Sequence, residues 1–209
     1  MISFSSSGYE AEYLERLSNL ISQASRKIDP NETAKLLLDK YGGIENIVAV
    51  EMDELSNLVG EQVAFYLKLV GRLTSRRYTD IFNFKVKHSQ AELGEYVRSR
   101  LLGESVEVIL AFPVDGQGRV LECREVSRGT VNSSSVLARK LAEVAVMTGV
   151  NRLMIAHNHP RGTAKPSDDD IAMTDGIADS LLCAGIRLEN HFVVSVTECE
   201  IIVPKCIID

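Results

Sequence analysis

The sequence predicts an α/β protein in which a mixed β-sheet is flanked by helices and preceded by a small all-α domain. Between residue 9 and about residue 77, apolar residues recur at helical spacing. Beyond residue 85, short β-rich apolar segments alternate with amphipathic helical segments. Hairpin-type turns also occur there, so parallel and antiparallel neighbours are expected in one sheet. We therefore expect a helical module over residues 1–80 and an α/β domain over residues 85–209.

The N-terminal module is expected to be a bundle of short helices. The first helix is indicated by Leu14, Leu17 and Ile21, and a second begins at Asp29-Pro30 and ends near Gly42. Further along the chain we expect a short apolar piece over 44–50, helices over 53–58 and 63–73, and a linker or boundary over 76–83.

The second domain shows both the helical and the strand periodicity of apolar residues. The expected elements, in chain order, are a helix over 88–102, strands over 106–114 and 119–126 joined by a turn at 115–118, a helix capped by Ser134 or Ser135 and stopped by Gly149, a strand over 152–156, a helix from Ser167 to about Gly185, and strands over 188–196 and 200–203. This order predicts a sheet covered by helices.

Composition narrows the function classes. The formal net charge is -6, and residues 1–80 hold 9 Lys and Arg against 12 Asp and Glu. Neither half is basic, so any binding to DNA is expected to be weak. No apolar run approaches the roughly 20 residues of a membrane helix, and the first residues do not resemble a signal peptide. We expect a cytoplasmic protein that makes no membrane contact; its oligomeric state is left open.

Four cysteines have no CxxC spacing, and we expect four reduced thiols. The alternative is that Cys199 and Cys206 are two zinc ligands, although they lack the tight spacing of such sites.

The stretch from Ala156 to Asp170 carries the chemistry. His157 and His159 follow a predicted strand, and residues i and i+2 of an extended segment point the same way. A loop containing glycine and proline returns the chain to a helix start that can supply Asp170. Two imidazoles and one carboxylate suit Zn²⁺ and leave a fourth position for water, as in catalytic zinc sites. A simpler interpretation of Ser167 and Asp170 is a helix cap with an acidic first turn.

The pattern H-x-H, seven residues, S, two residues, D resembles the JAMM motif of the MPN/JAB zinc metallopeptidases. The longer form H-N-H-P-x-G-x-x-x-P-S-x-x-D is similar to the RadC branch, from about residue 85 to 209, and Arg128-Gly129-Thr130 is RadC-like too. The resemblance implies a JAB/MPN-like fold with a cytidine-deaminase-like layout, and a site in which His157, His159 and Asp170 bind zinc. Arg161 stands where the family usually has serine, which puts a cation at the mouth of the site.

The resemblance also implies two catalytic residues. The family mechanism needs a glutamate on an upstream strand, for which Glu122 and Glu125 are candidates on opposite faces. RadC-like spacing before the Gly-Thr pair selects Glu125 as general base and acid. Ser167 would donate a hydrogen bond to the oxyanion, provided that its hydroxyl is not fully used as an N-cap.

The helical module resembles the helix-hairpin-helix unit that precedes RadC domains. Gly60 is present at the hairpin, but Glu61 replaces the apolar residue and Gln62 the second glycine. We expect the fold to be kept and the DNA contact to be lost. The basic cluster of Arg72, Arg76 and Arg77 is interpreted as a solvated face or a domain contact.

Three functional hypotheses follow. The first is a zinc-dependent hydrolase that cleaves an amide or isopeptide bond in a peptide or protein substrate. The second is a DNA-associated protein acting in repair or recombination. The third is a catalytically idle zinc domain used for protein contacts.

Overall fold

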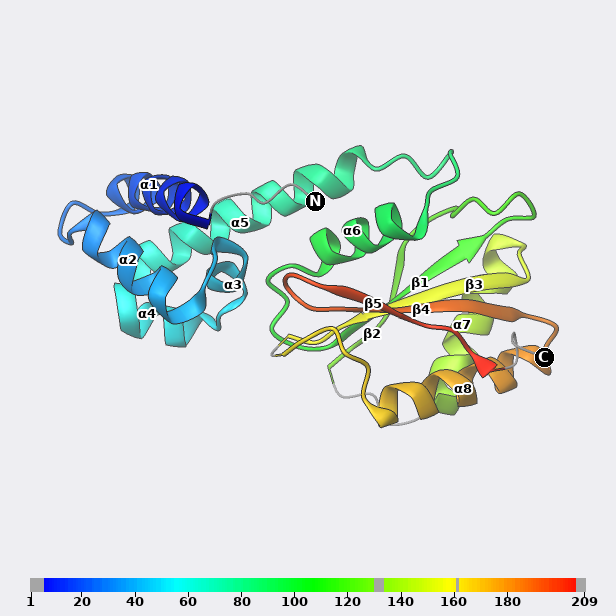
Figure 1. The fold of residues 1–209 in the computed structure, drawn as a ribbon. Helices are drawn as coiled ribbons and strands as arrows, with labels where there is room; N and C mark the ends of the chain where they lie inside the picture. Colours follow the sequence, from blue (N-terminus) through cyan, green and yellow to red (C-terminus); the bar gives the residue numbers. More distant parts are fainter. Residues whose placement is uncertain (1–5, 130–133, 161, 206–209) are drawn as a thin grey trace. The chain divides into compact units, whose positions relative to one another are not determined.

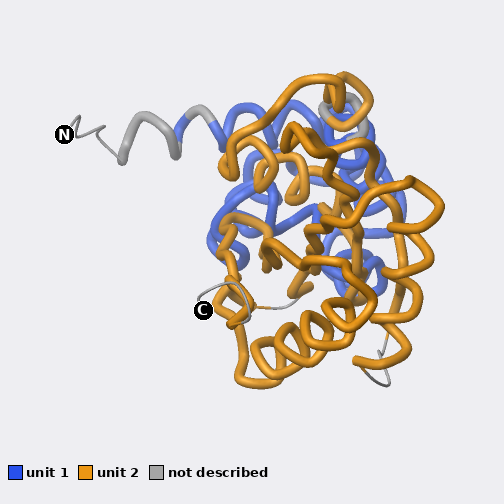
Figure 2. The backbone as a smooth tube through the Cα atoms, turned by 90° about the vertical axis from the view of Figure 1, so that its right-hand side faces the viewer, with its two compact units in different colours: residues 1–75 blue, residues 76–209 orange. Residues whose placement is uncertain are grey.

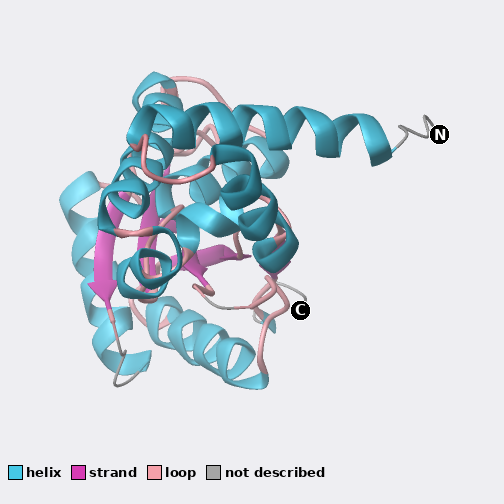
Figure 3. Cartoon of the chain, turned by 90° about the vertical axis from the view of Figure 1, so that its left-hand side faces the viewer, coloured by secondary structure: helices cyan, strands magenta, loops and turns pink. Residues whose placement is uncertain are grey.

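The fold is taken from a computed structural model, and the residues described are 6–129, 134–160 and 162–205. The chain divides into two compact units, residues 1–75 and 76–209 (Figure 2). Helices make up most of the regular structure, as the colours of Figure 3 show. Of the helices that the structure describes, none combines the length and apolar character needed to cross a membrane.

The first unit is helical, as its sequence predicts. Its helices are α1 (Ser6–Ala24), α2 (Pro30–Tyr41), α3 (Ile44–Ala49), α4 (Met52–Val59) and the first part of α5 (Glu61–Ile81). They enclose a core that includes the fully buried Leu17, Leu37 and Leu55. Asp29 caps α2 by accepting hydrogen bonds from two backbone N–H groups, and Gly42 ends the helix at φ 79°.

One expectation in this region is made more specific, and another needs correction. The apolar piece over 44–50 is the short helix α3 and its C-cap. The predicted linker or boundary over 76–83 begins where the two units divide, but it is helical as far as Ile81, because α5 runs on through it. The reason is local: residues 76–81 contain neither glycine nor proline, so nothing in them stops a helix.

The second unit contains one five-stranded sheet. Its elements are α6 (Gln90–Leu101), β1 (Val108–Val114), β2 (Arg124–Arg128), α7 (Ser134–Thr148), β3 (Arg152–Asn158), α8 (Asp168–Leu182), β4 (Arg187–Val194) and β5 (Cys199–Ile202). The strand order is β2-β1-β3-β4-β5. Only the β3–β4 pair is parallel, which confirms the predicted mixed sheet.

Helices cover both faces of this sheet (Figure 1). One face packs against α6 in a cluster that includes Tyr96, Leu110 and Phe112. The other packs against α7 and α8 in a cluster that includes Ile109, Leu141 and Ile177. Every residue of β1 is buried, as expected for a strand covered on both sides. We call these surfaces the α6 face and the α7/α8 face.

The second strand begins later than predicted. The turn at 115–118 forms, but residues 119–123 contribute only an isolated bridge between Val114 and Val120. Regular pairing with β1 starts at Arg124, and the register shifts between Ile109 and Leu110. The helix α7 begins at Ser134, one of the two serines predicted as its N-cap. The residues before it, 130–133, lie outside the described part of the chain.

Candidate metal centre

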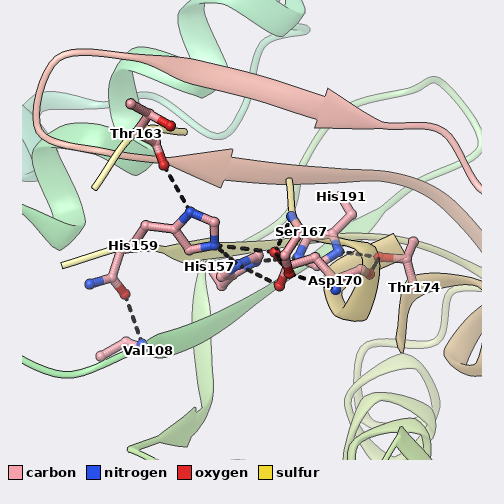
Figure 4. A network of polar contacts seen from close by, with 9 residues as sticks. Val108, His157, His159, Thr163, Ser167, Asp170, Thr174 and His191 are labelled. Atoms are coloured by element: carbon pink, nitrogen blue, oxygen red, sulfur yellow. Dashed lines mark hydrogen bonds and ion pairs between the residues drawn. The ribbon is translucent and has the colours of Figure 1, made fainter. Parts of the chain in front are cut away.

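The carboxyl end of β3 and the first turn of α8 bring the predicted ligands together. His157 is the penultimate residue of β3, and the backbone N–H of His159 donates to the Val194 carbonyl of the neighbouring β4 at 2.8 Å. Asp170 lies in the first turn of α8, which Ser167 caps. The expectation that the two histidines point to one place is met, because their Nε2 atoms are 3.0 Å apart (Figure 4).

The carboxylate of Asp170 completes a tight triangle. Its Oδ1 lies 3.1 Å from Nε2 of His157, and its Oδ2 lies 3.2 Å from Nε2 of His159. The His157 side chain is 3% exposed, against 18% for His159 and 14% for Asp170. The site is therefore buried on the strand side and opens toward solvent past His159.

The chemistry of these donor atoms fits a metal ion. Nδ1 of His159 lies 2.8 Å from the carbonyl oxygen of Thr163, which only accepts, so that nitrogen carries the hydrogen. Nε2 is then the nitrogen through which His159 can bind a metal, and it faces a carboxylate oxygen of Asp170 at 3.2 Å. Tetrahedral zinc ligands at roughly 2.05 Å lie roughly 3.3 Å apart, close to the separations seen here.

Asp170 keeps its negative charge. Burial alone would raise its pKa, but the contacts with His157 and Ser167 outweigh burial and hold the pKa of Asp170 well below its usual range. An ionised carboxylate beside two imidazoles supplies the charge that a divalent cation needs.

Ser167 orients this carboxylate. Its hydroxyl donates to Oδ2 of Asp170 at 2.6 Å, its N–H donates to the same oxygen at 2.8 Å, and its oxygen accepts from the Asp170 N–H at 3.1 Å. A serine hydroxyl has one hydrogen, and here it is committed. The predicted oxyanion role required a Ser167 hydroxyl that is not fully used in the helix cap. In this arrangement the hydroxyl is used there, and Ser167 acts on the site through Asp170.

Glu125 does not join the site. It pairs with Leu110, a member of the α6-face cluster, whereas His157 pairs with Ile109 of the α7/α8-face cluster. Paired residues share a face of the sheet. Glu125 therefore lies on the opposite face from His157, and its carboxylate accepts two hydrogen bonds from Arg128, each 2.9 Å long.

The predicted role of Glu125 as general base does not fit this placement. The cause is the register shift, which places an additional residue of β2 between the partners of Ile109 and Leu110. Arg124 lies on the α7/α8 face instead, where its guanidinium meets Sδ of Met147 on α7 at 3.5 Å. Among the residues of β2, all of them described, no carboxylate lies on that face. Glu122 precedes β2 and pairs with Arg124 at 2.6 Å.

Three residues near the ligands were not predicted. His191 of β4 contacts His157, Thr174 of α8 contacts His191, and the Asn158 side chain accepts from the Val108 N–H at 2.8 Å. The only sequence signal for His191 is a histidine directly before the apolar run of residues 192–194. Burial lowers the pKa of His191 well below its usual value, so this ring is neutral.

Other predicted features lie aside from the site. Within the described part of the chain, Cys123, Cys183 and Cys199 form no disulfide. Cys206, the second member of the alternative zinc pair, lies outside the described residues, as do Thr130 and Arg161. In the described residues, the group of His157, His159 and Asp170 is the one that could hold a metal ion.

A mixed sheet between helices, with a His-x-His pair at the end of a central strand and an aspartate in the next helix, defines a JAB/MPN-type α/β domain. Comparison with known families agrees, since the model of the RadC-like JAB domain matches residues 87–201. The chain belongs to this RadC-like family.

Relatives cover most of the chain. A UPF0758 protein of Neisseria meningitidis is 29% identical over 184 residues, which is 87% of this chain and 82% of that protein. A UPF0758 protein of Stenotrophomonas maltophilia is 31% identical over 170 residues, which is 79% of this chain and 73% of the relative. A third, from Methylibium petroleiphilum, is 30% identical over 172 residues.

Proposed function

We propose that this chain is a zinc-dependent hydrolase of the JAB type that acts on an amide or isopeptide bond in a peptide or protein substrate. The observation that carries the proposal is the convergence of two imidazole nitrogens and one ionised carboxylate, with ligand atoms within 4.8 Å of one another. Three protein ligands leave one position open, which is the arrangement of catalytic rather than structural zinc sites.

Different residues of the chain would bind the zinc and position its ligands. His157, His159 and Asp170 would hold Zn²⁺, and Ser167 would fix the carboxylate of Asp170 through its two hydrogen bonds. When bound, zinc supplies Lewis acidity and lowers the pKa of a water ligand to about 7. Access would come from the side of His159, the most exposed of the three ligands.

The first experiment measures metal content. We expect about one zinc per chain in the purified protein, because the described residues offer one such cluster. The double variant His157→Ala/His159→Ala should lose it, and Cys199→Ser is the control that should retain it. Full zinc occupancy in the double histidine variant would refute the site.

The second experiment tests turnover. Zinc-loaded protein is incubated with peptide and isopeptide-linked substrates, and product is followed by mass spectrometry with and without a chelator. Cleavage that disappears with the chelator and returns with zinc supports the hydrolase. Cleavage that the chelator leaves unchanged would contradict it.

A second candidate is a catalytically idle zinc domain used for protein contacts. Two observations favour it: Glu125 lies on the wrong face to act on the site, and the hydroxyl hydrogen of Ser167 is committed to Asp170. Full zinc occupancy without cleavage of any substrate would favour this second function.

A further inference from the structure

His191 lies at the centre of a chain of hydrogen bonds beneath the metal ligands (Figure 4). It is fully buried in β4. Its Nε2 is 2.7 Å from Nδ1 of His157, and its Nδ1 is 2.6 Å from Oγ1 of Thr174. That hydroxyl in turn lies 2.6 Å from the backbone carbonyl oxygen of Asp170. The chain thus starts at one metal ligand and ends at another.

In this series of hydrogen bonds, the donor and the acceptor of each bond can be assigned in one way only. The Asp170 carbonyl accepts and cannot donate, so the Thr174 hydroxyl must donate to it. The one hydrogen of the Thr174 hydroxyl is then in use, so Oγ1 must accept a hydrogen bond from Nδ1 of His191. A neutral imidazole carries one hydrogen, so Nε2 of His191 is a bare acceptor.

The same reasoning reaches the ligand itself. A bare Nε2 on His191 requires that Nδ1 of His157 donate to it. With Nδ1 occupied in this way, Nε2 is the nitrogen through which His157 can bind zinc, and it lies 3.1 Å from Oδ1 of Asp170. A histidine can bind zinc only through an unprotonated nitrogen.

We propose that His191 and Thr174 are positioning residues that hold His157 in the tautomer whose Nε2 is free to bind zinc. This inference rests on the zinc site proposed above. His159 reaches the same tautomer by simpler means, through the Thr163 carbonyl of its own loop. His157 faces the sheet and α8 instead, where it is 3% exposed, so its second nitrogen depends on a buried side chain.

These hydrogen bonds, which we call the His191 relay, also join three elements that are distant in sequence. His157 lies on β3, His191 on β4 and Thr174 on α8, and the last hydrogen bond ends on the backbone of Asp170. The ring orientation of one ligand is therefore linked to the helical turn that carries another. Outer groups of this kind tune metal affinity by about 10–100-fold when they are removed.

Zinc affinity tests the relay in the full-length protein, by competition of Zn²⁺ with a chromophoric chelator. Thr174→Val removes the hydroxyl and should weaken zinc binding by about 10–100-fold. Thr148→Val is the matched control, because Thr148 on α7 makes the same hydroxyl bond to a carbonyl four residues back, outside the site. Equal affinities for the Thr174→Val variant and the unmodified protein would overturn the proposal.

His191 is tested by two substitutions. His191→Leu removes the acceptor for Nδ1 of His157 and should weaken zinc binding to a similar extent. His191→Gln offers an amide oxygen as acceptor and should restore most of the affinity. A purely packing role predicts the reverse order, since leucine preserves an apolar contact better than glutamine does, and that result would also overturn the proposal.

A measurement without any substitution keeps the test independent of folding and of activity. Long-range ¹H–¹⁵N spectra of the metal-free protein at a pH of about 8, above the ordinary histidine pKa of about 6.5, report which ring nitrogen carries hydrogen. The expected result is a protonated Nδ1 on His157 and on His191. A bare Nδ1 on His157 would overturn the inference. Absence of zinc binding with the expected tautomers would instead refute the proposed function alone.

Discussion

The substitution Glu125→Gln separates the structure from the family resemblance. The resemblance makes this residue a general base, so that its loss would abolish hydrolysis. The structure places it on the α6 face, bound to Arg128 and away from His157. We expect Glu125→Gln to leave zinc binding unchanged and to leave any hydrolytic rate within about a factor of two, because general base catalysis by a group that cannot reach the site contributes nothing.

The effect on stability can be bounded from the ion pair. The Glu125 and Arg128 side chains are 33% and 45% exposed, so solvent screens their attraction. Such pairs contribute about 0.2–1 kcal/mol, and Arg128 keeps its second partner, Glu104. For a chain of this size, 1 kcal/mol corresponds to a change in Tm of about 2–4 °C. We therefore expect the Tm to fall by no more than about 4 °C.

The pH dependence gives an internal check. The hydrogen bond from Arg128 lowers the pKa of Glu125, so the folded state favours the ionised carboxylate. Its contribution is present above the unfolded carboxylate pKa of about 4.3 and is lost as the pH falls through the lower folded pKa. The difference in stability between the unmodified protein and Glu125→Gln should vanish at the acid end of this range.

Thermal unfolding, zinc competition and the cleavage assay together decide whether Glu125 acts as a general base. Glu104→Gln is the matched control, because it removes the other carboxylate bound to Arg128. A fall in rate of 100-fold or more in Glu125→Gln, with zinc retained and Glu104→Gln unaffected, would show that Glu125 is the base. The assignment of strand faces given above would then be wrong.

Three further predictions concern other parts of the chain. Asn158→Ala should lower the free energy of unfolding by about 1–3 kcal/mol in urea, because it leaves the buried N–H of Val108 without its acceptor; a negligible change would contradict that account. Burial raises the pKa of Cys123 to about 11, so stability should be full below about pH 9 and fall above it by up to about 1.4 kcal/mol per pH unit. Cys123→Ala should flatten this alkaline slope, and an unchanged slope would count against it. Fluorescence anisotropy of the full chain with a labelled duplex should give a Kd no tighter than about 1 μM at about 100 mM salt; tighter binding would mean that Glu61 does not block a phosphate contact.

Local sequence determined much of the fold. The helix α2 begins at Asp29 and ends at Gly42, as expected from a side chain that caps free N–H groups and a glycine that adopts positive φ. Alternating strands and helices beyond residue 85 predicted the mixed sheet between helices. The spacing of His157 and His159 predicted that both imidazoles point one way, because side chains alternate along an extended segment. These features depend on a few neighbouring residues, so they can be read along the chain.

Tertiary structure alone decided the face of Glu125 and the partners of His157. A strand shows which residues alternate, but one additional residue opposite Ile109 moves Glu125 relative to its neighbours, and only pairing with β1 reveals it. His191 lies 34 positions from His157, and Thr174 lies 17 positions from His191. No periodicity relates residues at such distances. Their contact arises because β3 and β4 pair in parallel while α8 packs over them, and this packing places His191 against His157 and Thr174 against His191.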